Sequence, residues 1–150
     1  MEEIILDKSS SQITQFAKLI QEVSWGAGKY LANIMINNQL SDFERVIVLT
    51  NQNELVGFAA LLKEDIVKDT GLTPFISTVF VAEKYRGKKL SQKLVSDLET
   101  IARQAGFSTV YIATAHIGLY EKIGYQHFDD KLDIMGRPMR LLKKQLTSAN

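Results

Sequence analysis

The chain has 150 residues, of which 45% are hydrophobic and 23% charged, and it contains no cysteine. This length suits a single domain over residues 1–150, because chains near this size bury about two-thirds of their unfolded surface. The missing cysteine excludes disulfides, thiolate metal ligands and cysteine nucleophiles. The two histidines, His116 and His127, are too far apart to suggest a zinc site, so we expect no metal.

The sequence carries no membrane or export signal that we can identify. No apolar run approaches the roughly 20 residues that cross a bilayer. The opening residues 1–7 are acidic rather than basic and lack the long apolar stretch of a secretory signal. We therefore expect a cytoplasmic protein with no membrane partner.

The net charge of +1 conceals two unlike halves. Residues 1–83 carry 6 basic and 11 acidic side chains, whereas residues 84–150 carry 12 basic and 6 acidic ones. Such an asymmetry can mark an anionic partner that one half binds, although charges can also be scattered without a function.

The first half begins with a short strand at residues 4–6 and two helices. Serines 9–11 can cap the first helix, and the second follows the break at residues 25–28. Their apolar faces consist of Ile13, Phe16, Ala17 and Ile20, and of Tyr30, Leu31, Ile34 and Met35. Residues 46–49 and 55–62 then read as two strands of a hairpin.

The second half alternates strands and helices. Residues 75–81 are the strongest strand signal, and Leu90 begins the best helix, which Gly106 ends. A strand at 110–113, a short helix at 116–123 and strands at 125–128 and 134–142 follow. The order predicts an α/β (α+β) fold with a mixed central sheet of about six to seven strands flanked by about four helices.

The turn at residues 83–92 joins the strongest strand to the best helix and is rich in basic residues. A helix N-terminus offers unpaired N–H groups and a positive dipole end, where basic side chains are unfavourable without an anion. Arg86, Lys88, Lys89 and Lys93 nevertheless lie there. These basic residues indicate either a phosphate site or a solvated, lysine-rich helix start. The turn does not have the glycine spacing of a P-loop.

Residues 79–91 closely resemble the acetyl-CoA-binding motif of the GNAT superfamily of N-acetyltransferases, whose turn reads Gln/Arg-x-x-Gly-x-Gly/Ala. Residues 119–125, Leu-Tyr-Glu-Lys-Ile-Gly-Tyr, are similar to a second segment of that family. The resemblance implies the GNAT fold and acetyl-CoA as cosubstrate. It implies that the cofactor is bound by Val79, Phe80, Val81, Arg86, Gly87, Lys88, Lys89, Leu90, Ser91 and Gln92.

Four positions depart from the family pattern, of which Ala82, in place of a common proline, is a minor change. Lys89 and Ser91 stand where the family usually has small residues, and Ala113 replaces a frequent asparagine. Lys89 matters if the family glycine has a positive φ, whereas helical φ and ψ there would tolerate a lysine. We expect weaker or repositioned cofactor binding rather than its loss.

The resemblance implies transfer of an acetyl group to an amine, with Tyr120 as the acid that protonates the departing thiolate. Spacing alone favours a core position for Tyr120, packed beside Ile117 and Ile123, and the acid role depends on the resemblance. No general base is identified, because Glu64, Asp65 and Glu83 are expected to be solvated surface carboxylates and water can serve instead. Without cysteine, the amine must attack acetyl-CoA directly.

The acceptor is expected to be a small-molecule amine, with a protein N-terminus or a lysine as the alternative. In this fold the first two helices usually form one wall of the acceptor site, which implicates Trp25 and Tyr30, while His116 could shuttle a proton. A catalytically inactive CoA-binding or sensing module is the competing interpretation. A nucleic-acid binder ranks last, since no basic face with interleaved aromatics is present. GNAT domains often dimerise, so a homodimer is left open.

Overall fold

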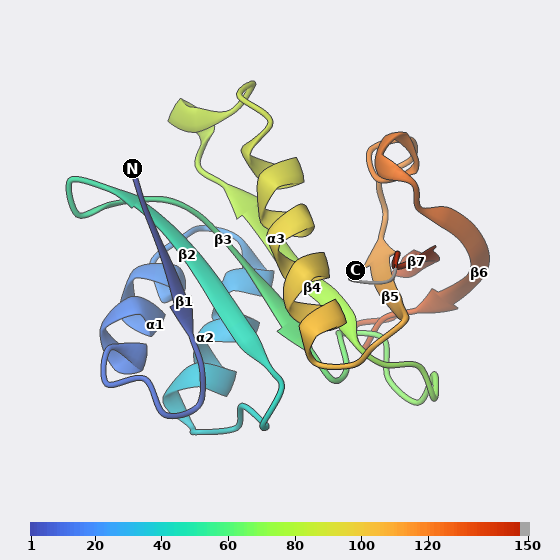
Figure 1. Cartoon of the computed structure of the whole chain (residues 1–150), viewed down its shortest axis with the longest axis horizontal. Helices are drawn as coiled ribbons and strands as arrows, with labels where there is room; N and C mark the ends of the chain where they lie inside the picture. The colour runs from blue at the N-terminus through green and yellow to red at the C-terminus, as the bar shows by residue number, and fades with distance from the viewer. Residues whose placement is uncertain (148–150) are drawn as a thin grey trace.

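A computed structural model describes residues 1–147 of the chain, and it contains one seven-stranded sheet in the order β1-β2-β3-β4-β5-β7-β6 (Figure 1). Three α-helices accompany it: α1 (Ile13–Gln21), α2 (Gly26–Ile36) and α3 (Leu90–Gln104). The strands are β1 (Glu2–Leu6), β2 (Arg45–Asn51), β3 (Glu54–Leu62), β4 (Phe75–Val81), β5 (Thr109–Thr114), β6 (Gln126–Leu132) and β7 (Pro138–Gln145). The predicted α/β class and strand count are confirmed.

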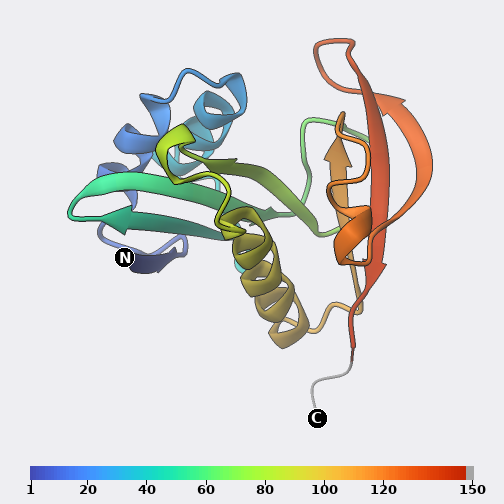
Figure 2. The same ribbon diagram turned by 90° about the horizontal axis from the view of Figure 1, so that it is seen from above.

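The helices cover both faces of the sheet, with α1 and α2 on one side and α3 on the other (Figure 2). On β2, Val46 and Val48 pack with α1 and α2, whereas Ile47 and Leu49 pack with α3. This two-sided burial explains why β2 reads as a continuous apolar run instead of an alternating one.

The expected fourth helix at residues 116–123 does not form. Only a 3-10 turn, η2 (Glu121–Ile123), is found there, and Ile117 is 83% exposed. Gly118 and Gly124 have φ angles of +88° and +99°, which end any α-helix within this short segment. The prediction of about four helices is therefore corrected to three α-helices among residues 1–147.

The last strand begins at Pro138 rather than at residue 134. The carboxylate of Asp133 accepts hydrogen bonds from the backbone N–H groups of Met135 and Arg137 and from Arg137 Nε, at 2.7–2.9 Å. These bonds close a tight turn between β6 and β7, and the apolar pair Ile134–Met135 lies in that turn instead of in a strand.

The sheet opens between β4 and β5. These parallel strands are paired at Phe75 and Tyr111 alone in the described chain, and the part formed by β5, β7 and β6 stands apart from β1–β4 (Figure 2). β4 also bulges, because two residues, Thr78 and Val79, oppose the single residue Ala59 of β3. The φ of Thr78 is +54°. The β5 side of residues 78–81 is therefore left without a partner strand.

Candidate active site

Two adjoining cavities occupy the opening between β4 and β5. The first, of about 680 Å³, is lined by the end of β4, the following loop and the start of α3. The second, of about 390 Å³, lies between α2, β4, β5 and the β6–β7 turn. Both are lined by Trp25, Val79, Ser91, His116 and Leu119, so they form one continuous site.

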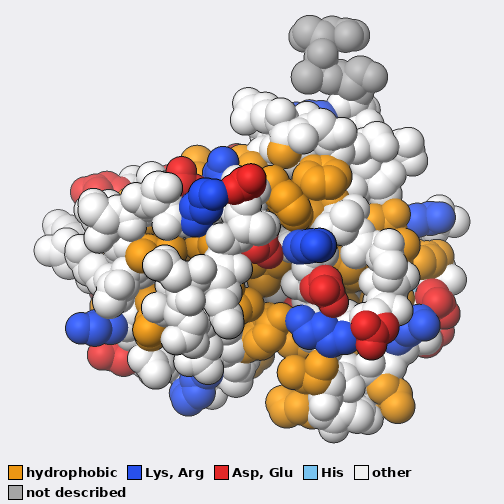
Figure 3. All heavy atoms as spheres, turned by 90° about the horizontal axis from the view of Figure 1, so that it is seen from below, with side chains coloured by type: hydrophobic (Ala, Val, Ile, Leu, Met, Phe, Trp, Pro, Cys, Tyr) orange, Lys and Arg blue, Asp and Glu red, His pale blue; other side chains and the backbone are white. Residues whose placement is uncertain are grey.

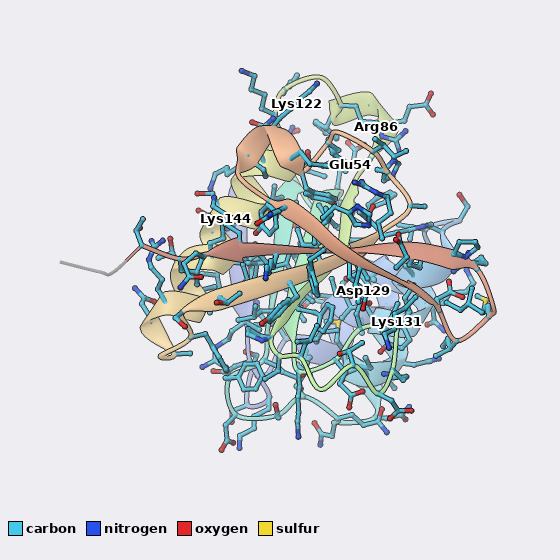
Figure 4. All side chains as sticks on the ribbon, turned by 90° about the vertical axis from the view of Figure 1, so that its right-hand side faces the viewer. Glu54, Arg86, Lys122, Asp129, Lys131 and Lys144 are labelled. Carbon is cyan, nitrogen blue, oxygen red and sulfur yellow. The ribbon has the colours of Figure 1, made fainter. Side chains whose placement is uncertain are left out.

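The first cavity has a basic lining. Arg86 and Lys89 line it, and no acidic residue among residues 1–147 does. Lys122, on η2, lies at the same end of the molecule as Arg86 (Figure 4). Figure 3 shows the end of the molecule opposite to Arg86 and Lys122, where acidic and basic side chains are mixed among hydrophobic ones. The first cavity is therefore suited to an anionic ligand.

The N-terminus of α3 forms one wall of this cavity and is uncapped. The first helical hydrogen bond runs from the Lys93 N–H to the Lys89 carbonyl (3.1 Å), and no side chain among residues 1–147 caps the helix start. The first turn of α3 contains no acidic residue. The amides of Leu90, Ser91 and Gln92 are thus available to a phosphate oxygen, as at other helix N-termini that bind anions.

The loop before α3 contains two left-handed residues, Gly87 with φ +85° and Lys89 with φ +59°. Gly87 adopts this conformation freely, whereas Lys89 is strained by about 1 kcal/mol. Position 89 therefore has the positive φ at which a lysine in place of the family's glycine is unfavourable. Lys89 lines the cavity despite this strain.

Side chains around the loop hold it in place. Arg86 Nε donates to the Val81 carbonyl (2.9 Å), and the buried Tyr85 donates its hydroxyl to Glu54 (3.1 Å). Lys93 pairs with Asp97 and Glu3, so its charge is already compensated outside the cavity. Of the ten residues expected to bind the cofactor, eight line the first cavity, while Lys88 and Gln92 do not.

Tyr120 is 8% exposed and lines the second cavity. Its hydroxyl makes no hydrogen bond to the described residues. Burial, and next the negative charge of Asp65, raise the pKa of the Tyr120 phenol to about 12. The phenol is therefore protonated at neutral pH. An ion pair between Arg140 and Glu121 (2.7 Å), together with a bond from the Gly118 N–H to Glu121 (3.0 Å), fixes the segment that carries it.

The three residues expected near the acceptor are brought together at the second cavity. Trp25 stacks on Phe80 of β4, with ring centroids 5.9 Å apart. The Tyr30 hydroxyl accepts a hydrogen bond from Lys68 Nζ (3.1 Å). His116 is exposed and lines both cavities, but it does not share a helix with Tyr120, contrary to the prediction.

The prediction that Asp65 is a solvated surface carboxylate is wrong. The exposure of Asp65 is 4%, whereas Glu64 and Glu83 are exposed as expected. It accepts hydrogen bonds from Ser77 Oγ (2.8 Å) and the Ile66 N–H (2.7 Å), and it lines the second cavity. Burial raises the pKa of Asp65 to about 6, although both hydrogen bonds act against this rise. One signal was available: Ser77 is a hydroxyl within an apolar strand, which needs a polar partner.

The chain was compared with protein families, curated sequences and solved structures. The family model described as the acetyltransferase (GNAT) family matches residues 11–125. A search of curated protein sequences found no significant match. The chain belongs to the GNAT acetyltransferase family.

Solved structures share the fold of this GNAT protein. The aminoglycoside 6'-N-acetyltransferase from Enterococcus faecium is 16% identical, with a TM-score of 0.71 and coverage of 100% of this chain and 99% of that one. Escherichia coli ElaA is 24% identical, with a TM-score of 0.68 and coverage of 96% and 99%. A GNAT family acetyltransferase from Elizabethkingia anophelis, solved with acetyl-CoA bound, is 16% identical, with a TM-score of 0.67 and coverage of 96% and 98%.

Residues 1–147 contain neither a membrane-spanning helix nor a cluster of metal-ligating side chains. No helix there has the length and hydropathy needed to cross a membrane. No three histidine, aspartate or glutamate side chains gather there as a metal site.

Proposed function

We propose that this GNAT protein transfers the acetyl group of acetyl-CoA to the primary amine of a small molecule. The observation that carries the proposal is the continuous site between β4 and β5, which joins an uncapped, basic helix N-terminus to a buried, protonated tyrosine. The acetyl-CoA complex of the Elizabethkingia protein, which has the same fold, supports the choice of cosubstrate.

In the proposed complex the first cavity holds the cofactor. The amides of Leu90 and Ser91, with the Arg86 and Lys89 cations, bind the pyrophosphate. The pantetheine arm lies along residues 79–81, where β4 has no partner strand on its β5 side. Its backbone groups then pair with the amides of the arm, and one N–H polarises the thioester carbonyl.

The reaction then proceeds in the second cavity. The acceptor ammonium loses one proton to water, and its nitrogen forms the new C–N bond with the thioester carbon. The C–S bond breaks, its electron pair stays on sulfur, and the Tyr120 hydroxyl protonates the thiolate. The tyrosinate takes the second proton from the nitrogen. Each turnover converts ammonium and acetyl-CoA into amide, CoA thiol and one released proton.

The size of the second cavity favours a small acceptor over a protein N-terminus or a lysine side chain. A volume of about 390 Å³ lies within the range of pockets that enclose a small molecule. The exposed rim at His116 and Leu119 leads into the first cavity and hence to the proposed thioester.

The test is calorimetric titration with acetyl-CoA, followed by measurement of thiol release across a panel of small amines and peptides. The proposal predicts saturable binding and amine-dependent thiol release, with small amines preferred over peptides. Absence of binding would reject it. Binding without turnover on any acceptor would identify an inactive CoA-binding module instead, and preference for peptides would identify a protein acetyltransferase.

A further inference from the structure

We propose that the carboxylate of Asp65 binds the ammonium of the acceptor, and that the second cavity selects an amine with a single positive charge and an apolar body. This inference rests on the proposed acetyl transfer and specifies the substrate class of the same site.

The hydrogen bonds of Asp65 leave one carboxylate oxygen for a ligand. Oδ1 receives both the Ser77 hydroxyl and the Ile66 N–H, and Oδ2 has no hydrogen bond to residues 1–147. Among these residues, the fully enclosed side-chain atoms that lack a partner are Ser41 Oγ and Thr78 Oγ1. Oδ2 is not one of them, so it remains accessible from the cavity that Asp65 lines.

Asp65 is also held rigidly. The Ile134 N–H donates to the Ile66 carbonyl (2.9 Å), which ties the loop after β3 to the β6–β7 turn. Together with the bond from Ser77, this contact holds the carboxylate against the bulged part of β4. A group fixed in this way loses little conformational freedom when it binds a cation.

Thr78 is a second residue of this cavity wall with an unsatisfied polar atom. Thr78 is 8% exposed and lines the same cavity, and its buried Oγ1 has no hydrogen-bond partner in the described chain. Thr78 also has the left-handed backbone of the β4 bulge. Unsatisfied buried hydroxyls are rare, and both Thr78 and Asp65 leave a polar atom of this cavity wall unpaired within residues 1–147.

Much of the remaining wall is apolar, although Ser91, Thr114, His116 and Arg137 also line it. It includes Ile76, Ile112, Leu119, Ile134, Met135 and Met139. Ile134 and Met135 are 57% and 64% exposed, so the wall that they form is open to an entering molecule. These side chains favour an alkyl or aryl group over a polyhydroxylated one.

The charges of the cavity limit the acceptor to one ammonium. Asp65 is the single acidic residue that lines the second cavity in residues 1–147, and the other formally charged residue there is Arg137. Arg137 Nε is paired with Asp133 (2.7 Å), and Asp133 does not line the cavity. A second ammonium would therefore meet a guanidinium and apolar carbon, without a carboxylate to compensate its desolvation.

The test compares the full-length wild type with Asp65→Asn. Aspartate-to-asparagine keeps the oxygen that accepts from Ser77 and Ile66 and removes the charge. Asp69→Asn is the matched control, because Asp69 lies in the same loop, is exposed and does not line the cavity. The acceptors are 2-phenylethylamine, with one ammonium, and spermidine and kanamycin, with several.

The expected result is that wild type prefers 2-phenylethylamine, and that Asp65→Asn raises its KM roughly 30-fold or more while the Kd for acetyl-CoA stays unchanged. Asp69→Asn should leave both constants unchanged. Equal KM values in wild type and Asp65→Asn, or a wild-type preference for the polyamines, would overturn the inference while leaving acetyl transfer intact.

A binding measurement separates this inference from the proposed function. Trp25 is the sole tryptophan of the chain and lines both cavities, so its fluorescence reports amine binding in the presence of CoA without any turnover. Fluorescence titration by 2-phenylethylamine in wild type but not in Asp65→Asn supports the ammonium site even if no thiol is released. Equal titration of both proteins, or of neither, rejects it.

Discussion

Asp65→Asn should make the protein more stable at neutral pH, although we expect it to impair the site. Burial moves the pKa of Asp65 from 3.8 to about 6, which costs the ionised folded state about 3 kcal/mol at pH 7.5. Asparagine keeps the acceptor for the Ser77 hydroxyl (2.8 Å) and the Ile66 N–H (2.7 Å) without the buried charge. The variant should recover most of that free energy of unfolding.

The pH dependence distinguishes this effect from general repacking. A folded pKa above the unfolded one means that the folded state binds the proton more tightly, so the penalty is absent below about pH 3.8 and complete above about pH 6. Urea unfolding should therefore give Asp65→Asn an advantage of about 3 kcal/mol at pH 7.5 and about 1 kcal/mol at pH 4.5. Asp69→Asn, at an exposed position, should show no such trend. An Asp65→Asn advantage that is the same at both pH values, or a loss of stability at pH 7.5, would refute the reasoning.

Three further predictions concern the cofactor site and Tyr120. Tyr120→Phe should lower kcat about 100-fold in thiol-release assays, while calorimetry gives an unchanged Kd for acetyl-CoA. Because the pKa of the Tyr120 phenol is about 12, the kcat of the wild type should not fall through tyrosine ionisation up to pH 10. Lys89→Gly removes the strain of a positive φ and should raise the free energy of unfolding by about 1 kcal/mol. It should also reduce the salt dependence of acetyl-CoA binding, because one cation is lost. Lys88→Gly, at a position without positive φ, should not stabilise the protein. Gly57→Ala would place a Cβ 2.6 Å from the Phe80 carbonyl oxygen, so it should cost about 1–3 kcal/mol in urea unfolding and weaken acetyl-CoA binding, while Gly26→Ala, with open space at its Cβ, should do neither.

The segment from β4 to α3 could be predicted from the sequence because its signals are local. The β-branched run 75–81, the basic turn and the apolar stripe of α3 each follow from spacing along the chain, and each forms in the structure. The conformation of Lys89 could not be predicted in this way, because a lysine in the sequence does not indicate a positive φ as a glycine can. The surrounding contacts impose it: Tyr85 and Arg86 anchor the loop on one side and α3 begins on the other.

The position of Asp65 could not be predicted because distant residues cause its burial. The β6–β7 turn, organised by Asp133, brings the Ile134 N–H to the Ile66 carbonyl, and this contact closes the loop after β3 over the cavity. Nothing within the loop's own sequence signals that packing. The expected helix at 116–123 fails for a related reason, since its glycines allow Arg140 of β7 to hold an irregular segment through Glu121 and the His116 carbonyl.

The most direct test of acetyl transfer by this protein is the fate of the acetyl group. Wild-type protein is incubated with acetyl-CoA and 2-phenylethylamine, and CoA thiol and acetylated amine are quantified together by mass spectrometry. We expect the two products to form in equal amounts, at a rate that saturates with both substrates and falls about 100-fold in Tyr120→Phe. Tight binding of acetyl-CoA with no acetylated amine, or thiol release that does not depend on the amine, would contradict this expectation.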